Sequence, residues 1–178
     1  MAGPAQRAPG DDARFAGLAK TMGRAPRILL LSAPYYRDIA DALEAGARAE
    51  LALAAAEVSS VEVAGALELP QALDIVLDGP RGDGVDGVVV IGCVIRGETS
   101  HYDIVCETSN HWLMEVALRH GVPIGNALLT VDTHDQAVRR AEGGRAGKGG
   151  DAARACLALI ELSHRNDRTR TEFKDIEV

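Results

Sequence analysis

Hydrophobic and polar residues follow two different periods along the chain, and the two periods alternate. In five segments the apolar residues recur every three or four positions, as they do on one face of a helix. Between these segments lie short apolar or alternating runs rich in Val, Ile and Leu, which are typical of strands. The predicted strands are 27–32, 57–63, 88–95 and 122–130, and the predicted helices are 38–53, 69–77, 103–120, 132–141 and 151–163.

This alternation predicts a single α/β domain. Helices that link successive strands favour a three-layer sandwich, in which a four-stranded parallel, flavodoxin-like sheet is flanked by helices through right-handed crossovers. Segment 88–95 is apolar throughout and is expected inside the sheet, covered on both faces. We expect the folded domain at 26–164, between a flexible N-terminal tail (1–25) and a polar C-terminal tail (165–178), with Phe15 and Leu18 able to dock locally.

The segment VVVIGCVIRGETSHYD (88–103) places a polar loop directly after the central strand. Open α/β sheets bind ligands at the carboxyl ends of their strands, so this loop is a candidate site. Gly97 lets the backbone approach a bound group, and the amides that open the next helix favour an anion. His101 supplies a side chain that exchanges protons near neutral pH. Together these features predict a reaction site for an anionic ligand.

The other strand exits bring further candidate residues to the same edge. Tyr35 and Tyr36 follow the first strand, where an aromatic ring can stack on a flat heterocycle or simply cap the core. Glu68 follows the second strand, where its carboxylate can accept hydrogen bonds from ligand hydroxyls or serve as a favourable charge near a helix start. The fourth exit is expected at 126–130.

A glycine-rich link, EGGRAGKGG, separates the last two predicted helices. It is not a nucleotide-binding P-loop, because Glu142 and Gly149 stand where that motif requires Gly and Ser or Thr. Arg140, Arg145 and Lys148 lie in or beside this link. One or two of these cations can hold a small phosphate, or the link can be a solvated basic turn.

Composition limits the classes of function. With 178 residues, of which 47% are hydrophobic, the chain is long enough for one core. A net charge of -7 argues against nucleic acid or an anionic membrane surface as a partner. The sequence has no apolar run that would span a membrane and no apolar signal core at its start, so we expect a cytoplasmic protein.

The cysteines and histidines show no metal-ligand spacing. Cys93 and Cys156 are expected as small core residues rather than reactive thiols. Apart from His101, the histidines are interpreted as structural or solvent-exposed, and no metal site is expected; these are His111, His120, His134 and His164.

Residues 27–162 resemble the 6,7-dimethyl-8-ribityllumazine synthase family. The resemblance rests on SAPYYRDIADAL, GALELP, GCVIRGETSHYDIV, GVPIGNALLTVDTHDQA and RAEGGRAGKGG, in the family's order and spacing. The third segment is highly specific, and the others are strong as an ordered set. Enzymes of this family join 5-amino-6-(D-ribitylamino)uracil to 3,4-dihydroxy-2-butanone 4-phosphate, the penultimate step of riboflavin biosynthesis. The reaction releases phosphate and water and uses no metal or organic cofactor.

The resemblance also implies roles for individual residues. His101 would transfer protons, and Arg140 would stabilise the leaving phosphate. The residues that would meet the ribitylaminouracil are Tyr35, Ala66, Leu67, Glu68, Cys93, Val94, Ile95 and, from a neighbouring subunit, Asn126. Those that would hold the butanone phosphate are Glu98, Thr99, Arg140 and Lys148.

The chain departs from the family pattern at three places. Ala64 stands where proline is usual, Asn126 stands where many members carry an aromatic residue, and the link lacks the Gly-Asn-Lys form common in capsid-building members. The resemblance implies a homo-oligomer with sites between subunits, and a pentamer is the smallest such assembly. It leaves pentamer, decamer and icosahedral shell open, and it suggests riboflavin synthase as a further partner.

Two other functions compete with the transferase. One is a paralogue that binds riboflavin or a lumazine with little or no turnover, although a pure binder has no need of His101, Arg140 and Lys148 together. The other is a flavodoxin-like electron carrier. The sequence Pro34-Tyr35-Tyr36 disfavours it, because it occupies the place of a phosphate loop rich in Ser, Thr and Gly.

Overall fold

The sheet has four strands that all run in the same direction. The computed structural model describes residues 14–174, with side chains through residue 166. In spatial order the strands are β2 (Glu57–Glu62), β1 (Arg27–Ala33), β3 (Gly87–Ile95) and β4 (Ile124–Val131). Neighbouring strands are parallel at each of the three pairings, so the predicted flavodoxin-like α/β architecture is confirmed.

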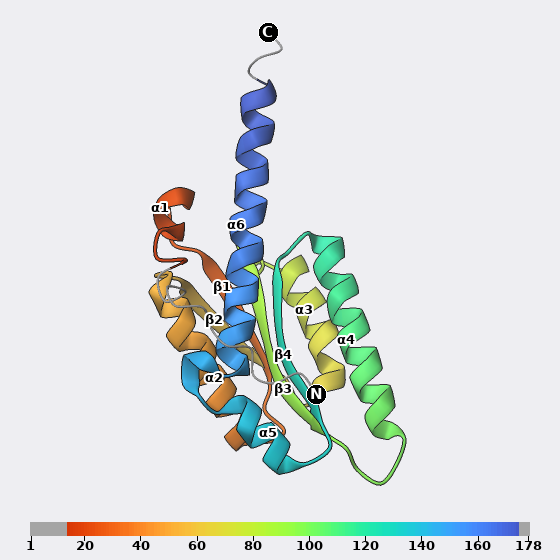
Figure 1. Ribbon diagram of the computed structural model, residues 1–178. Helices are drawn as coiled ribbons and strands as arrows, with labels where there is room; N and C mark the ends of the chain where they lie inside the picture. Colours follow the sequence, from red (N-terminus) through yellow and green to blue (C-terminus); the bar gives the residue numbers. More distant parts are fainter. Residues whose placement is uncertain (1–13, 175–178) are drawn as a thin grey trace.

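Helices cover both faces of this sheet (Figure 1). One face carries α2 (Arg37–Leu53), α5 (His134–Ala141) and α6 (Lys148–Lys174), and the other carries α3 (Leu69–Asp78) and α4 (His101–His120). The short helix α1 (Leu18–Met22) precedes β1, and single turns of 3-10 helix form η2 (Ala66–Glu68) and η3 (Gly144–Ala146). No helix in the described part of the chain has the length and hydropathy needed to cross a membrane.

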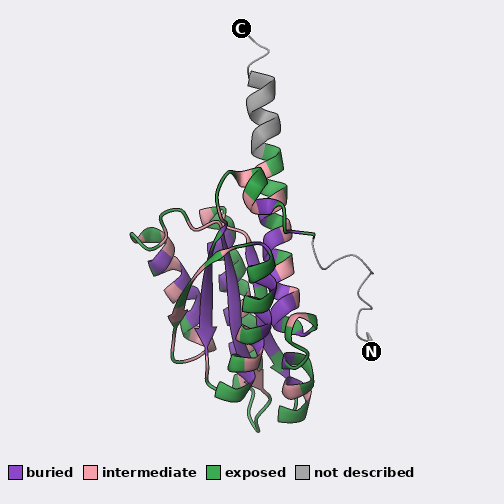
Figure 2. Ribbon diagram, turned by 90° about the vertical axis from the view of Figure 1, so that its left-hand side faces the viewer, coloured by how far each residue is buried: buried purple, intermediate pink, exposed green. Residues whose placement is uncertain are grey.

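Alternate residues of the central strands face opposite helical layers. Leu30 packs with α2 and α6, whereas Leu29 and Leu31 pack toward α3 and α4. Both sides of β1 and β3 are therefore buried, as the purple strands of Figure 2 show. This double burial explains why these strands are apolar at nearly every position instead of alternating.

The carboxyl ends of the four strands lie at one edge of the sheet, which we call the carboxyl rim. β3 extends beyond β1 there, because the β1–β3 register ends at the pair Ala33–Gly92 while β4 pairs with β3 through Ile95. The backbone groups at the end of β3 that point toward β1 therefore have no strand partner among the described residues. Such groups can bind a ligand.

Several element boundaries differ from the prediction. α4 begins at His101 rather than 103, and α6 begins at Lys148 rather than 151. β4 continues through Val131, because Ala127, Leu129 and Val131 all pack against the core. The fourth strand exit is therefore at 132, and the prediction of 126–130 for it is wrong.

The predicted tails also contain structure. Within residues 14–25, Phe15 and Leu18 are buried against the core, so part of the segment predicted to be a flexible tail docks on the domain. Residues 1–13 lie outside the described part of the chain. At the other end, α6 continues past 164 to Lys174. The domain limits 26 and 164 stay a prediction.

Candidate active site

Two tyrosines follow β1 at the carboxyl rim and differ in exposure. Tyr36 is half-buried against the core, and this burial raises its pKa. Tyr35 is 74% exposed and packs edge-on against Tyr36, with ring centroids 5.1 Å apart and an interplanar angle of 72°. One tyrosine therefore caps the core, as the simpler interpretation had it, and the other presents a ring that can stack on a flat ligand.

The exit of β2 forms the turn η2. Ala66 and Leu67 are half-buried, whereas Glu68 is exposed and directly precedes α3. A Cβ built on Gly65 would lie 3.0 Å from Oε2 of Glu68, so this carboxylate folds back over its own turn. Glu68 thus stands near a helix start and is accessible at the rim, and both interpretations of its role fit its position.

The end of β3 offers backbone rather than side-chain chemistry. Cys93 is buried, and burial raises the pKa of its thiol to about 11, so the thiol is neutral at physiological pH. Val94 and Ile95 are half-buried beyond the last residue that pairs with β1. Their main-chain groups are the polar atoms that this part of the rim presents. Cys156 is also buried, with its pKa raised to about 12, so both cysteines are core residues as predicted.

The loop after β3 carries the candidate base and the candidate anion site. Gly97, Glu98 and Thr99 are exposed, and His101 is the first residue of α4. The backbone N–H of His101 donates to Oγ1 of Thr99 over 3.4 Å. The imidazole of His101 is exposed at the same helix terminus whose amides favour an anion. The structure therefore places the imidazole of His101 at the start of α4, beside the exposed loop 97–100, and the anion site itself stays a prediction.

Arg96 forms a cluster that the sequence analysis missed. Its guanidinium pairs with Asp103 at 3.1 Å and Asp132 at 3.2 Å, and it lies 4.1 Å from the ring centroid of Tyr102. The hydrogen bond to Asp103 is the main cause of the raised pKa of Arg96. Its charge is thus balanced within the chain, and it ties β4 to α4 instead of serving the anion site. The sequence signals were Asp103 in the same segment and Asp132 just past the next strand.

His134 fixes the start of α5 beside the tyrosines. Its Nε2 lies 3.0 Å from Oδ2 of Asp38 on α2, and its ring meets that of Tyr36 edge-on at 6.4 Å. Thr133 caps the helix by accepting from the N–H of Gln136 at 3.3 Å. The helix that carries Arg140 is therefore anchored at the carboxyl rim.

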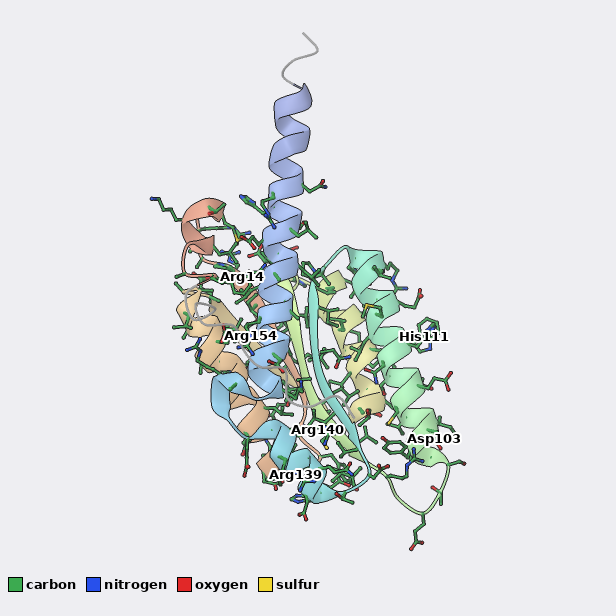
Figure 3. The ribbon with its side chains drawn as sticks, in the orientation of Figure 1. Arg14, Asp103, His111, Arg139, Arg140 and Arg154 are labelled. Carbon is green, nitrogen blue, oxygen red and sulfur yellow. The ribbon has the colours of Figure 1, made fainter. Side chains whose placement is uncertain are left out.

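The glycine-rich link brings Arg140 and Lys148 together. Gly147 packs so closely on the end of α5 that a Cβ there would lie 2.9 Å from the carbonyl oxygen of Ala141. Arg140 precedes Ala141 and Lys148 follows Gly147, so the two cations arise from adjoining backbone. Both side chains are exposed; Arg140 donates to the carbonyl of Gln136 at 3.1 Å, and Lys148 pairs with Asp151 at 2.8 Å. In Figure 3, Arg139 and Arg140 lie toward the same end of the molecule as Asp103.

Arg145 does not join this pair. Its Nε donates to the buried carboxylate of Glu50 at 3.0 Å, so it points into the joint between α2 and α6. The link is thus partly exposed and partly packed: Lys148 is exposed, whereas Arg145 pairs internally and the buried glycines allow close backbone packing.

Asn126 is not at the carboxyl rim. It pairs opposite Val90 in the sheet, five residues before the end of β4, or about 16 Å along the strand. Its side chain donates to Oδ1 of Asn110 on α4 at 2.7 Å and accepts from the N–H of Leu128 at 2.8 Å. Within one chain, Asn126 is thus separated from Tyr35 and His101, along an edge strand of the sheet.

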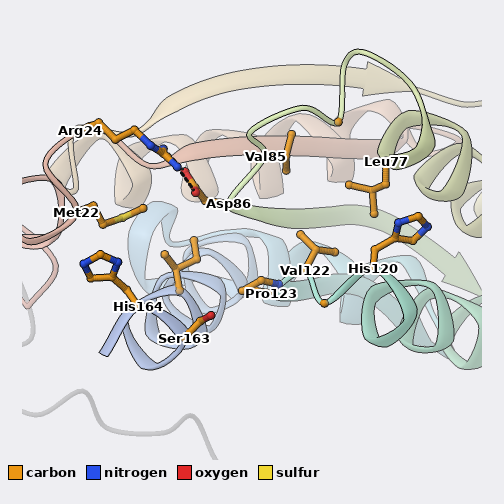
Figure 4. A pocket seen from close by; sticks show the side chains of 13 residues that line it. Met22, Arg24, Leu77, Val85, Asp86, His120, Val122, Pro123, Ser163 and His164 are labelled. Atoms are coloured by element: carbon orange, nitrogen blue, oxygen red, sulfur yellow. Dashed lines mark hydrogen bonds and ion pairs between the residues drawn. The ribbon is translucent and has the colours of Figure 1, made fainter. Parts of the chain in front are cut away.

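A cavity of about 460 Å³ lies at the opposite edge of the sheet (Figure 4). It is lined by residues that precede the strands, among them Arg24, Asp86 and Pro123, and by His164 from α6. Arg24 and Asp86 form an ion pair of 2.6 Å there. This cavity contains none of the predicted site residues.

One group of described residues could share a cation. Asp74, Asp78 and His120 have ligand atoms within 4.8 Å of one another, also away from the carboxyl rim. Nε2 of His120 lies 2.9 Å from Asp74, and Arg119 lies 2.6 Å from the same oxygen. The hydrogen bond from His120 is the main reason that the pKa of Asp74 is lowered. These contacts already explain the group as a link between α3 and α4.

Comparison with known proteins gives a consistent result. A sequence model of the family described as 6,7-dimethyl-8-ribityllumazine synthase matches residues 25–164. Proteins of that name are similar to most of this chain. The one from Azorhizobium caulinodans is 47% identical over 78% of this chain and 87% of its own length. The one from Agrobacterium fabrum is 47% identical over 77% of this chain and 94% of its own length. The one from Rhodopseudomonas palustris is 41% identical over 93% of this chain and 98% of its own length.

Proposed function

The chain belongs to the 6,7-dimethyl-8-ribityllumazine synthase family, a family of transferases, and we propose that it catalyses the reaction of that name. In this reaction, 5-amino-6-(D-ribitylamino)uracil condenses with 3,4-dihydroxy-2-butanone 4-phosphate to give the lumazine, phosphate and water. The observation that carries the proposal is the gathering of Tyr35, Glu68 and His101 at the carboxyl rim of a family-matched domain.

The ribitylaminouracil fits the part of the rim formed by β1, β2 and β3. The exposed ring of Tyr35 would stack on the pyrimidine, and the unpaired backbone groups of 93–95 would bond its polar edge. Residues 66–68 would meet the ribityl chain, with the Glu68 carboxylate accepting hydrogen bonds from its hydroxyls.

The butanone phosphate fits the part of the site that presents backbone amides and cationic side chains. The amides of Glu98 and Thr99 lie in the exposed loop before α4 and would bind the phosphate oxygens. Arg140 and Lys148, which arise from adjoining backbone, would supply the charge. A dianionic phosphoester is the chemistry that such an arrangement recognises.

The proposed chemistry needs no redox step. The uracil's amine attacks the ketone to give a carbinolamine and, after loss of water, an imine. Phosphate then leaves, the ring closes and a second water is lost. His101 would carry protons between these steps. Arg140 would stabilise the departing phosphate, and holding both reactants in one pocket would remove much of the entropic barrier.

We further propose that the active protein is a homo-oligomer with its sites between subunits. Asn126 lies along the uncovered edge strand β4, where it can serve only the rim of another subunit. α4 also presents apolar side chains to solvent, including Trp112 at 52% and Leu118 at 72% exposure. A second copy of the chain would cover this surface, because exposed apolar patches of this kind mark interfaces. A pentamer is the smallest assembly that we propose.

All three cysteines are free, which suits the reducing cytoplasm in which we place the enzyme. Riboflavin synthase would consume the lumazine and is the protein partner that we propose.

The test is to mix the purified protein with both substrates and to follow lumazine fluorescence together with phosphate release. We expect both signals to appear in equal amounts and to require both substrates. Tight binding of riboflavin or lumazine without product would instead show a binding protein that has lost turnover.

A further inference from the structure

A buried carboxylate, Glu50, lies behind the proposed phosphate site. It is on α2, and it is only 2% exposed. Its Oε2 accepts hydrogen bonds from Nε of Arg145 at 3.0 Å and from Nη1 of Arg154 at 2.9 Å. A charge buried this deeply is stable only when it is paired and hydrogen-bonded, and two guanidinium groups meet that need here.

The ion pairs continue from Glu50 to the surface. The second terminal nitrogen of the Arg154 guanidinium, Nη2, donates to Oδ1 of Asp151. The second oxygen of that carboxylate, Oδ2, accepts from Nζ of Lys148 at 2.8 Å. Arg154 is therefore held between two carboxylates, and Asp151 is held between two cations. Figure 3 shows Arg154 on the part of α6 that faces α2.

The five charged side chains named in these contacts sum to one positive unit. Arg145, Arg154 and Lys148 are cationic, and Glu50 and Asp151 are anionic. Lys148 is the most exposed of the three cations and lies at the end of the network beside Arg140. A free lysine side chain loses much rotamer entropy when it is fixed in one position, so a partner that holds it in advance favours ligand binding.

We propose that Glu50 is a positioning residue for the phosphate-binding end of the site, acting through Arg154 and Asp151 on Lys148. This inference rests on the proposed role of Lys148. Without the Glu50 carboxylate, Nη1 of Arg154 would lose its charged partner and keep the carbonyl oxygen of Arg145 at 2.9 Å, and the guanidinium would shift toward Asp151. Asp151 would then release Lys148, whose ammonium would no longer be held in one place.

The direction in which Glu50→Gln changes phosphate affinity distinguishes a positioning role from a simple effect of charge. Replacing Glu50 by glutamine adds one unit of positive charge near the site, and charge alone would strengthen phosphate binding. Loss of positioning would weaken it. A tighter phosphate complex in the variant would therefore overturn the proposal.

The test is a double-mutant cycle of Glu50→Gln and Lys148→Met in the assembled protein. We expect Glu50→Gln to raise the KM for the butanone phosphate about three- to tenfold and to leave the KM for the uracil unchanged. In the Lys148→Met background the same substitution should change neither constant. Glu44→Gln is the matched control, because it removes an ion pair with Arg48 on the same helix without touching the network.

Additive effects in the cycle, or equal rises in both KM values, would show that Glu50 only supports the fold. Asp151→Asn is the second route to the same result, since Asp151 is at the surface and its loss leaves Glu50 paired. It should reproduce the selective rise in KM. Arg154→Lys should retain more phosphate affinity than Arg154→Met, because only the former keeps the charge between the two carboxylates.

Binding of inorganic phosphate distinguishes failure of this inference from failure of the proposed reaction. Its affinity, measured by calorimetry without the uracil, should fall in Glu50→Gln and show the same dependence on Lys148. If the wild type makes no lumazine yet this coupling is present, the reaction assignment is wrong and the positioning role stands. If lumazine forms and the coupling is absent, the positioning role is wrong.

Discussion

Gly149 packs against the carbonyl oxygen of Leu43 so closely that no side-chain carbon fits between them. Gly149 is in the first turn of α6, and Leu43 is fully buried in the middle of α2. The glycines of the link thus serve to bring two helix backbones together. The network of Glu50, Arg145 and Arg154 crosses the same joint, so close packing and buried charge support each other there.

We expect Gly149→Ala to lower the free energy of unfolding by about 3 kcal/mol or more, because the new methyl group would force α2 and α6 apart. Helix propensity alone predicts a gain of about 1 kcal/mol, so the two explanations differ in sign. Denaturant unfolding followed by circular dichroism measures the change. Gly17→Ala, where a Cβ meets nothing within 4 Å, should change stability little. A stable Gly149→Ala variant would contradict the packing described here.

Arg140→Ala should weaken use of the butanone phosphate far more than binding of the uracil. A charge-assisted hydrogen bond to phosphate contributes enough that we expect the KM for this substrate to rise roughly ten- to hundredfold. Steady-state kinetics with each substrate varied in turn measures the difference. Arg139→Ala, on the adjacent position of the same helix, serves as the control. Equal losses for both substrates would exclude the role assigned to Arg140.

His101→Ala should slow turnover by roughly a hundredfold or more while leaving residual activity, because the pocket still holds both reactants together. Lumazine fluorescence measures the rate, and light scattering measures the assembly. His164→Ala is the control, since His164 lies in the cavity at the opposite edge of the sheet (Figure 4). If His101→Ala dissociates the oligomer, the residue has a structural role instead.

The stability contributed by the contact between Asp74 on α3 and His120 on α4 should depend on pH in the acid range. Hydrogen bonding from His120 lowers the pKa of Asp74 below its ordinary value of 3.8. A carboxylate whose pKa falls on folding contributes stability above its unfolded pKa and loses it as the pH falls through the folded value. We therefore expect wild type to lose stability faster than Asp74→Asn as the pH falls below about 3.8. Thermal melts between neutral and strongly acid pH test this, and parallel curves would exclude it.

The two buried cysteines should resist thiol reagents. Burial raises the pKa of Cys93 to about 11 and that of Cys156 to about 12, so at pH 8 few molecules carry either thiolate. We expect a disulfide reagent to modify Cys106, which is less buried, before the other two. Mass spectrometry of the time course identifies the order. Early labelling of Cys93 would mean that the rim opens more than the structure shows.

Most of the fold could be predicted because its elements are encoded locally. The period of the apolar residues separates strand from helix, and the order of the elements leaves few topologies once crossovers are right-handed. Tyr35, Glu68 and His101 follow from the same logic, since each lies in or at the end of the connection that follows a strand, and parallel strands share one carboxyl edge. The packing of Phe15 and Leu18 was only partly foreseen, because so short a segment shows little periodicity.

Sequence alone therefore determined the α/β class, the strand and helix segments, the family resemblance and the residues of the carboxyl rim. Tertiary structure decided what depends on contacts between distant segments. The β3–β4 register extends β4 through Val131 and leaves Asn126 away from the rim. The charge of Arg96 is neutralised by carboxylates from two other segments. Tertiary structure also brought Glu50 into contact with Arg145 and Arg154, which lie about a hundred residues further along the sequence. Periodicity describes only neighbours along the chain, and a buried charge takes its partners from whatever the packed helices bring beside it.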